Sequence, residues 1–341
     1  MRMRLGTLAI LVLGVLALGA GPSVEAQERL NLLCSPDPAW CEAVKRDFTK
    51  ATGIQTEFVR LSSGAALARL RAEKANPAFD VWFGGSGDSH WVAQAEGLLE
   101  FFRPKAWGEL RSQLTRMVDG HYIPLYSGLH GFGVNEKILQ EKGLPVPETW
   151  KELGDPRYKG LIAMPNPNTS GTGYVMMTTV IQVYGEEPGF ELSKAIHKNV
   201  AQYTRSGGDP SLLAGRGEVA IGVSFANDVV ERARKAFPIR FVAPKDGTGY
   251  EIGALSLVTG AANRAAALRF IDWALEPENQ KLGPQNGEVS IQSHSRSVID
   301  KDVPRFEDAK VIAYDFGKYG TPAVRDALIK RWTEQVFPIP R

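Results

Sequence analysis

The chain has 341 residues, and its 40 lysines and arginines nearly balance its 38 aspartates and glutamates, giving a formal net charge of +2. Because no block of like charge stands out, the sequence does not indicate a nucleic-acid-binding protein. The length exceeds the roughly 250 to 300 residues that one hydrophobic core usually organises, so we expect two lobes.

The N-terminal residues 1–26 have the pattern of a secretory signal peptide. Met1 to Arg4 carries two arginines, Leu5 to Ala20 is almost purely apolar, and small residues stand at Val24 and Ala26. The apolar stretch is shorter than a membrane span and polar sequence follows it at once, which favours a cleaved signal over an anchor. We therefore predict an exported protein.

Two cysteines, Cys34 and Cys41, stand where the first strand and the first helix after the signal peptide are expected. The residues before Cys34 are Asn31, Leu32 and Leu33 instead of the small residues that lipidation requires, so we expect a soluble periplasmic protein. In an oxidising compartment the pair is expected to form a disulfide that stabilises the fold by about 2.5 kcal/mol. Two unpaired thiols are the alternative.

Short apolar runs alternate with helical patterns in the first part of the chain. The expected strands are residues 30–34, 54–61 and 79–85, and the expected helices are 39–53, 65–77 and 89–97. Gly53 and Gly97 stand where glycine commonly ends a helix. The alternation predicts an α/β fold with a mainly parallel sheet covered by helices.

A second alternating set follows Tyr126. Strands are expected at 130–135, 161–167, 200–207, 219–225, 239–244 and 253–260, and helices at 227–235, 266–277 and in the tail from Pro304. The stretch from Tyr174 is rich in β-branched residues, so propensity alone leaves it open to strand or helix. No repeat of fixed period is present.

Polar and glycine-rich segments follow the expected strands, and in open α/β sheets ligands bind beyond the carboxyl ends of the strands. These segments are Ser35, 62–64, 84–88, 168–172, 206–209 and 227–228. Because they converge on two facing rims, we predict a cleft between two lobes.

Several longer motifs resemble the periplasmic solute-binding proteins of ABC importers, in the group with ferric-binding and hexose-phosphate-binding members. They include DVWFGGSGD, PETWKELGDPRYKGLIAMPNPNTSGTGY, GEVAIGVSFANDVV and GTGYEIGALSLVTG. The resemblance implies the two-lobed type II periplasmic binding protein fold, closing on ligand at a hinge. It implies lobe one from 27–125 plus 251–303, lobe two from 126–250 and C-terminal helices from 304–341. It also favours a helix after Tyr174.

The SGTGY segment carries three candidate ligand-binding residues, Ser170, Gly171 and Thr172. Small residues let backbone N–H groups approach a ligand, and the dipole of a helix that starts near Thr172 favours an anion there. A simple capping turn is the alternative.

Asn227, Asp228 and Glu251 form a second candidate group. Carboxylates and an amide at strand ends suit sugar hydroxyls or ammonium groups. Hexose-phosphate-binding relatives carry a histidine at the position of Asn227, followed by aspartate, with a glutamate matching Glu251. The departure at Asn227 leaves the solute open. The alternatives are helix capping by Asp228 and a solvent-facing charge at Glu251.

The remaining candidates lie on the rims or where the chain crosses between lobes. Their alternatives are helix capping on the rims and hinge packing at the crossing. The residues are Ser35, Ser63, Gly85, Ser86, Ser127 and Ser206.

The sequence contains few features typical of a metal site or an enzyme active site. The five histidines lack metal-ligand spacing, and neither a GxSxG motif nor a Walker loop is present. Phe225 stands where the resemblance to ferric-binding relatives would place paired tyrosines. We expect no cofactor, no bound metal, no catalysis and a monomer.

The sequence therefore predicts a binding protein that delivers a small polar anion to an inner-membrane ABC permease. A phosphorylated sugar or an organophosphonate is the leading solute. One alternative is a ferric or ferric-chelate importer component, and another is a secreted hydrolase on the same fold.

Overall fold

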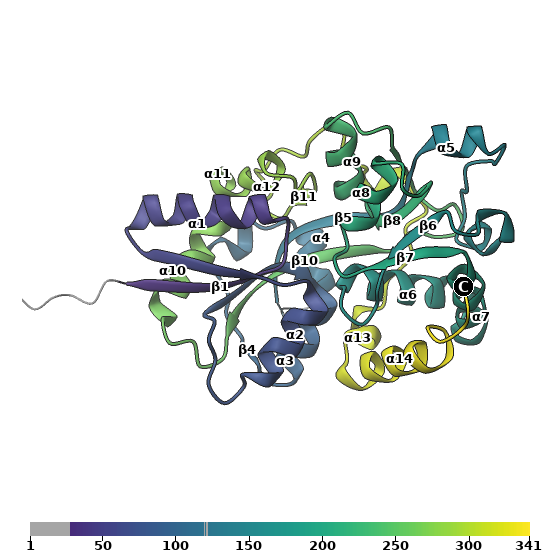
Figure 1. The fold of residues 1–341 in the computed structure, drawn as a ribbon. Helices are drawn as coiled ribbons and strands as arrows, with labels where there is room; N and C mark the ends of the chain where they lie inside the picture. Colours follow the sequence, from purple (N-terminus) through teal and green to yellow (C-terminus); the bar gives the residue numbers. More distant parts are fainter. Residues whose placement is uncertain (1–27, 119, 121) are drawn as a thin grey trace, which may run out of the picture.

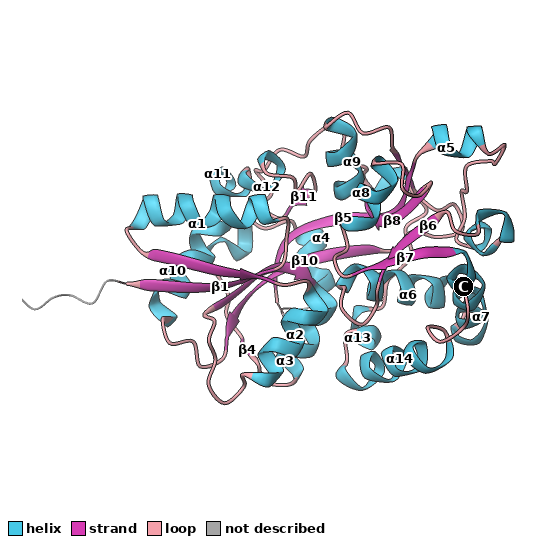
Figure 2. Ribbon diagram, in the orientation of Figure 1, coloured by secondary structure: helices cyan, strands magenta, loops and turns pink. Residues whose placement is uncertain are grey.

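A computed structural model describes residues 28–118, 120 and 122–341, so the predicted signal peptide lies outside the described residues. Helices pack against both faces of an eleven-stranded sheet (Figure 2). Among the residues described, no helix has the length and apolar character needed to cross a membrane.

The expected strands and helices lie close to their expected positions. The strands are β1 (Arg29–Cys34), β2 (Gln55–Arg60), β3 (Val81–Ser86), β4 (Leu99–Glu100), β5 (Ile123–Val134), β6 (Ile162–Pro165), β7 (Val200–Thr204), β8 (Ile221–Phe225), β9 (Arg240–Val242), β10 (Tyr250–Val258) and β11 (Ile291–Gln292). The α-helices are α1 (Pro38–Thr52), α2 (Ser63–Ala72), α3 (Gly87–Ala95), α4 (Ser112–Val118), α5 (Glu136–Glu141), α6 (Gly171–Tyr184), α7 (Glu186–Asn199), α8 (Asp209–Gly215), α9 (Ala226–Arg234), α10 (Arg264–Ala274), α11 (Pro277–Gln280), α12 (Leu282–Gln285), α13 (Phe316–Tyr319) and α14 (Pro322–Gln335). Short 3-10 helices are η1 (Lys105–Glu109), η2 (Lys151–Gly154), η3 (Pro156–Tyr158) and η4 (Phe306–Asp308). The sequence pattern did not indicate β4, β11, α4, α5, α7, α8, α11 and α12.

The sheet has the strand order β2-β1-β3-β10-β5-β8-β6-β7. β1 runs parallel to β2 and β3, and β6 runs parallel to β7 and β8. The central strands β10 and β5 are antiparallel to their neighbours. The expectation of a mainly parallel sheet was therefore wrong, because two strands that cross the middle of the molecule separate the parallel groups (Figure 1).

β5 is the longer of the two crossing strands and belongs to both halves of the sheet. Its first part, residues 123–129, pairs with β10, and its second part, residues 130–134, pairs with β8. All twelve of its residues are buried. The strand is longer than the sequence pattern indicated, because its N-terminal half continues through the crossing.

Two main clusters of buried apolar side chains lie on either side of the crossing. Trp40, Phe48 and Phe270 belong to the cluster around the N-terminal strands, and Trp150 and Phe190 belong to the other. Each half of the sheet therefore has its own core, which agrees with the length argument.

The stretch after Tyr174 is helical, as the family resemblance favoured. Ser170 precedes α6, and its hydroxyl accepts a hydrogen bond from the N–H of Gly173 at 3.3 Å. Burial of α6 therefore overrides the strand propensity of its β-branched residues.

The C-terminal segment forms helices, as expected, and packs over α6. The Tyr174 hydroxyl donates to the carbonyl of Tyr319 at 2.6 Å, and the Arg325 guanidinium lies 4.1 Å from the centre of the Tyr174 ring. The Tyr314 hydroxyl donates to Asp88 of α3 at 3.3 Å. The segment thus contacts both halves of the molecule.

Candidate functional site

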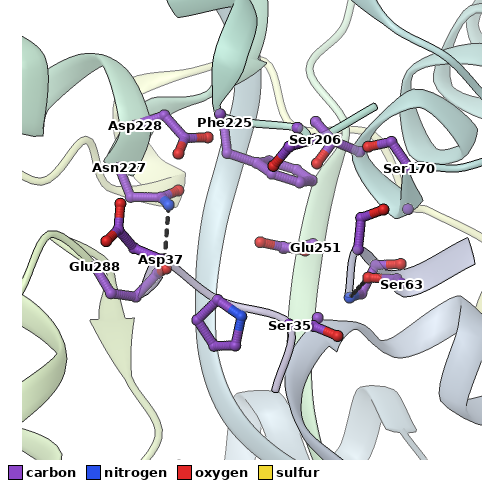
Figure 3. A pocket seen from close by; sticks show the side chains of 18 of the residues that line it. Ser35, Asp37, Ser63, Ser170, Ser206, Phe225, Asn227, Asp228, Glu251 and Glu288 are labelled. Carbon is purple, nitrogen blue, oxygen red and sulfur yellow. Dashed lines mark hydrogen bonds between the residues drawn. The ribbon is translucent and has the colours of Figure 1, made fainter. Parts of the chain in front are cut away.

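A cavity of about 340 Å³ lies beyond the carboxyl ends of β1, β2, β3, β7 and β8 (Figure 3). Its walls come from both halves of the sheet and from the crossing strand β10, which contributes Glu251. Serines gather at one end of the cavity, whereas Asp228 and Glu288 lie at the other. The two ends therefore differ in chemistry.

Three helices begin at the serine-rich end. Ser62, Ser86 and Ser170 are the N-cap residues of α2, α3 and α6. Backbone N–H groups at a helix N-terminus and the helix dipole both favour an anion. This end is therefore built to receive negative charge.

Close approach at the serine-rich end depends on Gly171. A Cβ on Gly171 would lie 2.0 Å from Ser86 Oγ, and one on Gly64 would lie 2.8 Å from the carbonyl oxygen of Asn168. The Ser86 hydroxyl is buried and has no hydrogen-bond partner among the residues that the structure describes. α6 can thus approach α3 only because glycine has no side chain.

Arg60 connects three segments at the edge of this end. Its Nη2 donates to Ser206 Oγ at 2.9 Å and to the carbonyl of Ser35 at 3.3 Å, and its Nε donates to the carbonyl of Pro36 at 3.2 Å. Exposed Arg205 also lines the cavity. Both arginines add positive charge on the side where the helices begin.

Cys34 and Cys41 form the predicted disulfide, with a Cα–Cα distance of 6.2 Å. The bond closes the loop that forms one wall of the cavity. This loop supplies four lining residues, from Ser35 to Pro38. The Trp82 indole donates to Ser35 Oγ at 2.9 Å, and the Asp37 carboxylate accepts from the N–H of Ala39 at the start of α1. The disulfide therefore fixes one wall of the cavity.

Asp37, Asp228 and Glu288 lie at the opposite end, and Glu251 projects between the two ends (Figure 3). Burial raises the pKa of Asp228 to about 7, although Arg232 opposes the rise. Burial also raises the pKa of Glu251 and Glu288 well above the usual range, and each is raised further by the charge of Asp228. Asn227 donates its side-chain amide to Glu288 Oε1 at 2.7 Å. Carboxyl groups in such an environment accept hydrogen bonds from polar ligand groups.

Eleven of the twelve predicted binding residues line the cavity. They are Ser35, Ser63, Gly85, Ser86, Ser170, Gly171, Thr172, Ser206, Asn227, Asp228 and Glu251. Ser127 does not line it: the residue is fully buried in β5, and its hydroxyl donates to the carbonyl of Glu251 at 2.5 Å. Ser127 therefore supports the crossing strands, as its alternative of hinge packing described.

For three other candidates, the structure also tests the alternative roles of helix capping and solvent exposure. Ser170 caps α6 and also lines the cavity, so capping and lining coincide. Asp228 lies in the first turn of α9, and the N-cap position belongs to Phe225 instead. Glu251 is 5% exposed and is therefore not a solvent-facing charge.

The cavity also has lining residues outside the predicted set. They are Pro36, Asp37, Pro38, Arg60, Ser62, Tyr126, Arg205, Gly207, Gly208, Asp209, Phe225, Arg232 and Glu288. Arg60 ends a strand, so the strand-end rule could have found it. Glu288 lies in a loop after α12, far from any expected strand end, and no sequence signal marked it.

Across the described ranges, no group of three or more histidine, cysteine, aspartate or glutamate side chains could hold a metal ion. Phe225, which stands where the resemblance to ferric-binding relatives would place paired tyrosines, forms part of the cavity wall. The polar groups that line this cavity are hydroxyls, backbone N–H groups, arginines and carboxyl groups.

Comparison with known proteins agrees with this architecture. Residues 79–317 match the family of bacterial extracellular solute-binding proteins. An uncharacterized protein of Haemophilus influenzae is 39% identical over 334 residues, which cover 96% of this chain and 95% of that protein. A periplasmic protein of Salmonella typhimurium named for 2-aminoethylphosphonate binding is 25% identical over 291 residues, 82% of each chain.

A solved structure is similar over nearly the whole chain. The periplasmic binding protein AfuA from Actinobacillus pleuropneumoniae, with exogenous fructose-6-phosphate bound, has a TM-score of 0.87 and 32% identity, and the match covers 92% of this chain and 100% of that one. These findings confirm the predicted two-lobed type II fold. The chain, with a cavity between two α/β halves, belongs to the bacterial extracellular solute-binding proteins.

Proposed function

We propose that the protein captures a small solute that carries a phosphate or phosphonate group, and delivers it to an ABC permease at the inner membrane. The observation that carries the proposal is the meeting of the N-termini of α2, α3 and α6 at one end of the cavity. A phosphorus oxyanion has several acceptor oxygens, which match the N–H and hydroxyl donors at this end.

The opposite end supports a polar remainder of the solute. The carboxyl groups of Asp228, Glu251 and Glu288 are available to accept hydrogen bonds from the solute there, and Asn227 already donates one to Glu288. The volume of about 340 Å³ is at the small end of the usual range for ligand pockets. A short solute with an oxyanion at one end and donors at the other fits both the size and the charge pattern.

Two relatives support the same chemistry. Fructose-6-phosphate, bound in the similar AfuA structure, combines a phosphate with hydroxyl groups. The compound 2-aminoethylphosphonate, for which the Salmonella typhimurium relative is named, combines a phosphonate with an amine. Both solutes pair a phosphorus oxyanion with hydrogen-bond donors.

Contacts across the cavity support capture by closure of the two lobes. Arg60 of β2 donates to Ser206, which follows β7, and Asn227 of α9 donates to Glu288. We infer lobe one from residues 27–125 with 251–303, lobe two from 126–250, and a C-terminal helical segment from 304–341. When the lobes close, both contact the solute at the same time.

Isothermal titration calorimetry with the purified protein tests the proposal. Fructose-6-phosphate and 2-aminoethylphosphonate are expected to include at least one binder, whereas fructose and ethylamine, which lack the oxyanion, are expected not to bind. Thr172→Asp adds a negative charge to the anion end and is expected to abolish binding. Asn168→Asp adds the same charge to an exposed residue of the same loop, outside the cavity lining, and should leave affinity unchanged.

Two results would overturn the proposal. Equal binding of a phosphorylated compound by wild type and Thr172→Asp would mean that the SGTGY loop is only a turn. Release of inorganic phosphate during the titration, measured on the recovered solute by mass spectrometry, would show a hydrolase. A binding protein returns the solute unchanged.

A further inference from the structure

The acidic end of the cavity, defined as Asp228, Glu251 and Glu288, brings three carboxyl groups together without an ion-pair contact to a basic side chain of the described ranges. Among the described residues, no lysine, arginine or histidine lies within 4.0 Å of the side-chain oxygens of these three residues. Arg232 is the basic residue that lines this side, and it pairs with Glu231 and lies 4.0 Å from Asp37. No ion pair with a described residue therefore stabilises the ionised form of these three carboxyl groups, and a cationic ligand would supply the missing partner.

Glu251 points into the cavity without a partner. Its side chain is 5% exposed, no hydrogen bond to its carboxylate occurs in the part of the chain that the structure describes, and Figure 3 shows it projecting between the two ends. A buried carboxylate without a donor is unfavourable unless a ligand supplies one. This orphaned acceptor indicates a donor group on the solute.

Glu288 is held in place for the same role. One of its oxygens accepts the amide of Asn227 at 2.7 Å, and the residue is 5% exposed at the cavity wall. Asn227 comes from α9, whereas Glu288 comes from the loop after α12, so the contact joins two segments across the cavity. Asn227 thus fixes the direction of the Glu288 carboxylate.

We propose that the acidic end recognises a positively charged amino group, and that Glu288 is a residue that sets this preference. The inference rests on the proposed function, so the solute becomes a zwitterion with a phosphate or phosphonate at one end and an ammonium group at the other. An ammonium group brings three N–H donors and a full positive charge, whereas a hydroxyl brings one donor and no charge. Only the ammonium group supplies the positive charge that stabilises the ionised form of these carboxyl groups.

Matched solute pairs test the inference on the wild-type protein, without any variant. The compounds 2-aminoethylphosphonate and 2-hydroxyethylphosphonate differ only in the group that faces the acidic end, and glucosamine-6-phosphate and glucose-6-phosphate form a second such pair. By calorimetry at pH 7.5, the amine of at least one pair is expected to bind roughly tenfold more tightly or better. Equal affinities within both pairs would overturn the inference while leaving the proposed function intact.

Glu288→Gln tests the assigned residue. The variant keeps an oxygen that can accept the Asn227 amide, but removes the negative charge. It is expected to weaken binding of the amine roughly tenfold and to leave the hydroxyl analogue unchanged. The control Glu278→Gln removes a surface carboxylate that is 77% exposed and pairs with Lys281, and should change neither affinity.

The outcomes separate the two levels of the proposal. An equal loss for amine and hydroxyl in Glu288→Gln would mean that Glu288 only supports the fold, and would overturn its role in specificity. If no phosphorus compound of either pair binds the wild type, the proposed function itself fails. Should Glu288→Gln fail to fold, Glu251→Gln provides the same comparison at the other buried carboxylate.

Discussion

Asp228 is the titratable side chain that links the cavity to the stability of the empty protein. Its pKa is raised from 3.8 to about 7, so the folded protein holds a proton on this carboxyl where the unfolded chain has lost it. Between those values the folded state binds more protons, and the free energy of unfolding contributed by Asp228 falls as the pH rises. Ionisation of the empty acidic end thus opposes folding.

Asp228→Asn is therefore expected to gain stability relative to wild type as the pH rises from 5 to 8. Urea unfolding at a series of pH values gives the difference in the free energy of unfolding. His90 and His130 have lowered pKa values and act with the opposite sign below pH 6.5, so their contributions cancel in the difference between variant and wild type. That difference reports Asp228 together with Glu251 and Glu288, whose pKa burial raises and its charge raises further. A difference that stays constant over this pH range would contradict the prediction.

At the residue scale, the cavity-lining residues that directly follow strands could be predicted from the sequence. Ser35, Thr172 and Asp228 could be predicted because the carboxyl ends of strands share an edge of the sheet. Glu288 could not, because its position depends on how the segment after α12 folds back over the cavity. Ser127 has a residue type suited to binding, but its place in a crossing strand directs its hydroxyl to a backbone carbonyl.

At the scale of elements, the N-terminus of α6 can contact α3 only through a residue without a side chain. Gly171→Ala would place Cβ 2.0 Å from Ser86 Oγ and 2.7 Å from Ser86 Cβ, so the two helices must move apart. We expect affinity for the solute to fall roughly tenfold, since the anion end no longer closes.

Calorimetry of Gly171→Ala beside Gly108→Ala measures this effect. Gly108 has open space where its Cβ would lie, so its substitution should leave affinity unchanged. Similar affinity in both variants would show that the anion end tolerates a wider spacing of α3 and α6.

The disulfide belongs to the same scale because it closes the loop between β1 and α1. Cys34→Ser combined with Cys41→Ser is expected to lower the free energy of unfolding by about 2.5 kcal/mol, from loop entropy. Affinity should fall as well, because the loop from Ser35 to Pro38 lines the cavity. Urea unfolding and calorimetry measure the two effects. A variant with lower stability and unchanged affinity would show that the loop keeps its shape without the bond.

Local periodicity predicted most of the longer strands and helices, whereas it missed α7 and several short elements and could not give the order of the strands. Alternating strands and helices indicated an α/β fold but suggested a mainly parallel sheet. β10 lies antiparallel between β3 and β5, and this placement depends on contacts between residues far apart in the chain. The stretch from Tyr174 was ambiguous for a related reason, because burial decides its conformation.

At the scale of the molecule, closure of the proposed lobes should be visible in solution. Small-angle X-ray scattering is expected to show a smaller radius of gyration when a solute found by calorimetry is added, because the lobes gain solute contacts only when shut. Gly171→Ala is expected to show a smaller decrease at saturating solute. Superimposable curves with and without solute would contradict closure.

The position of β10 also has a consequence for the order of folding. β10 (Tyr250–Val258) lies in the centre of the sheet and pairs with β3 (Val81–Ser86). The two strands are neighbours in space but far apart in the sequence. While the chain is being made, β3 and β5 have exposed strand edges until residue 258 has been added. Such edges are prone to pair with other chains, and distant contacts of this kind form slowly. The sheet, and with it the cavity, is therefore completed only when residues 250–258 pair with β3 and β5, and association with other chains competes with folding until then.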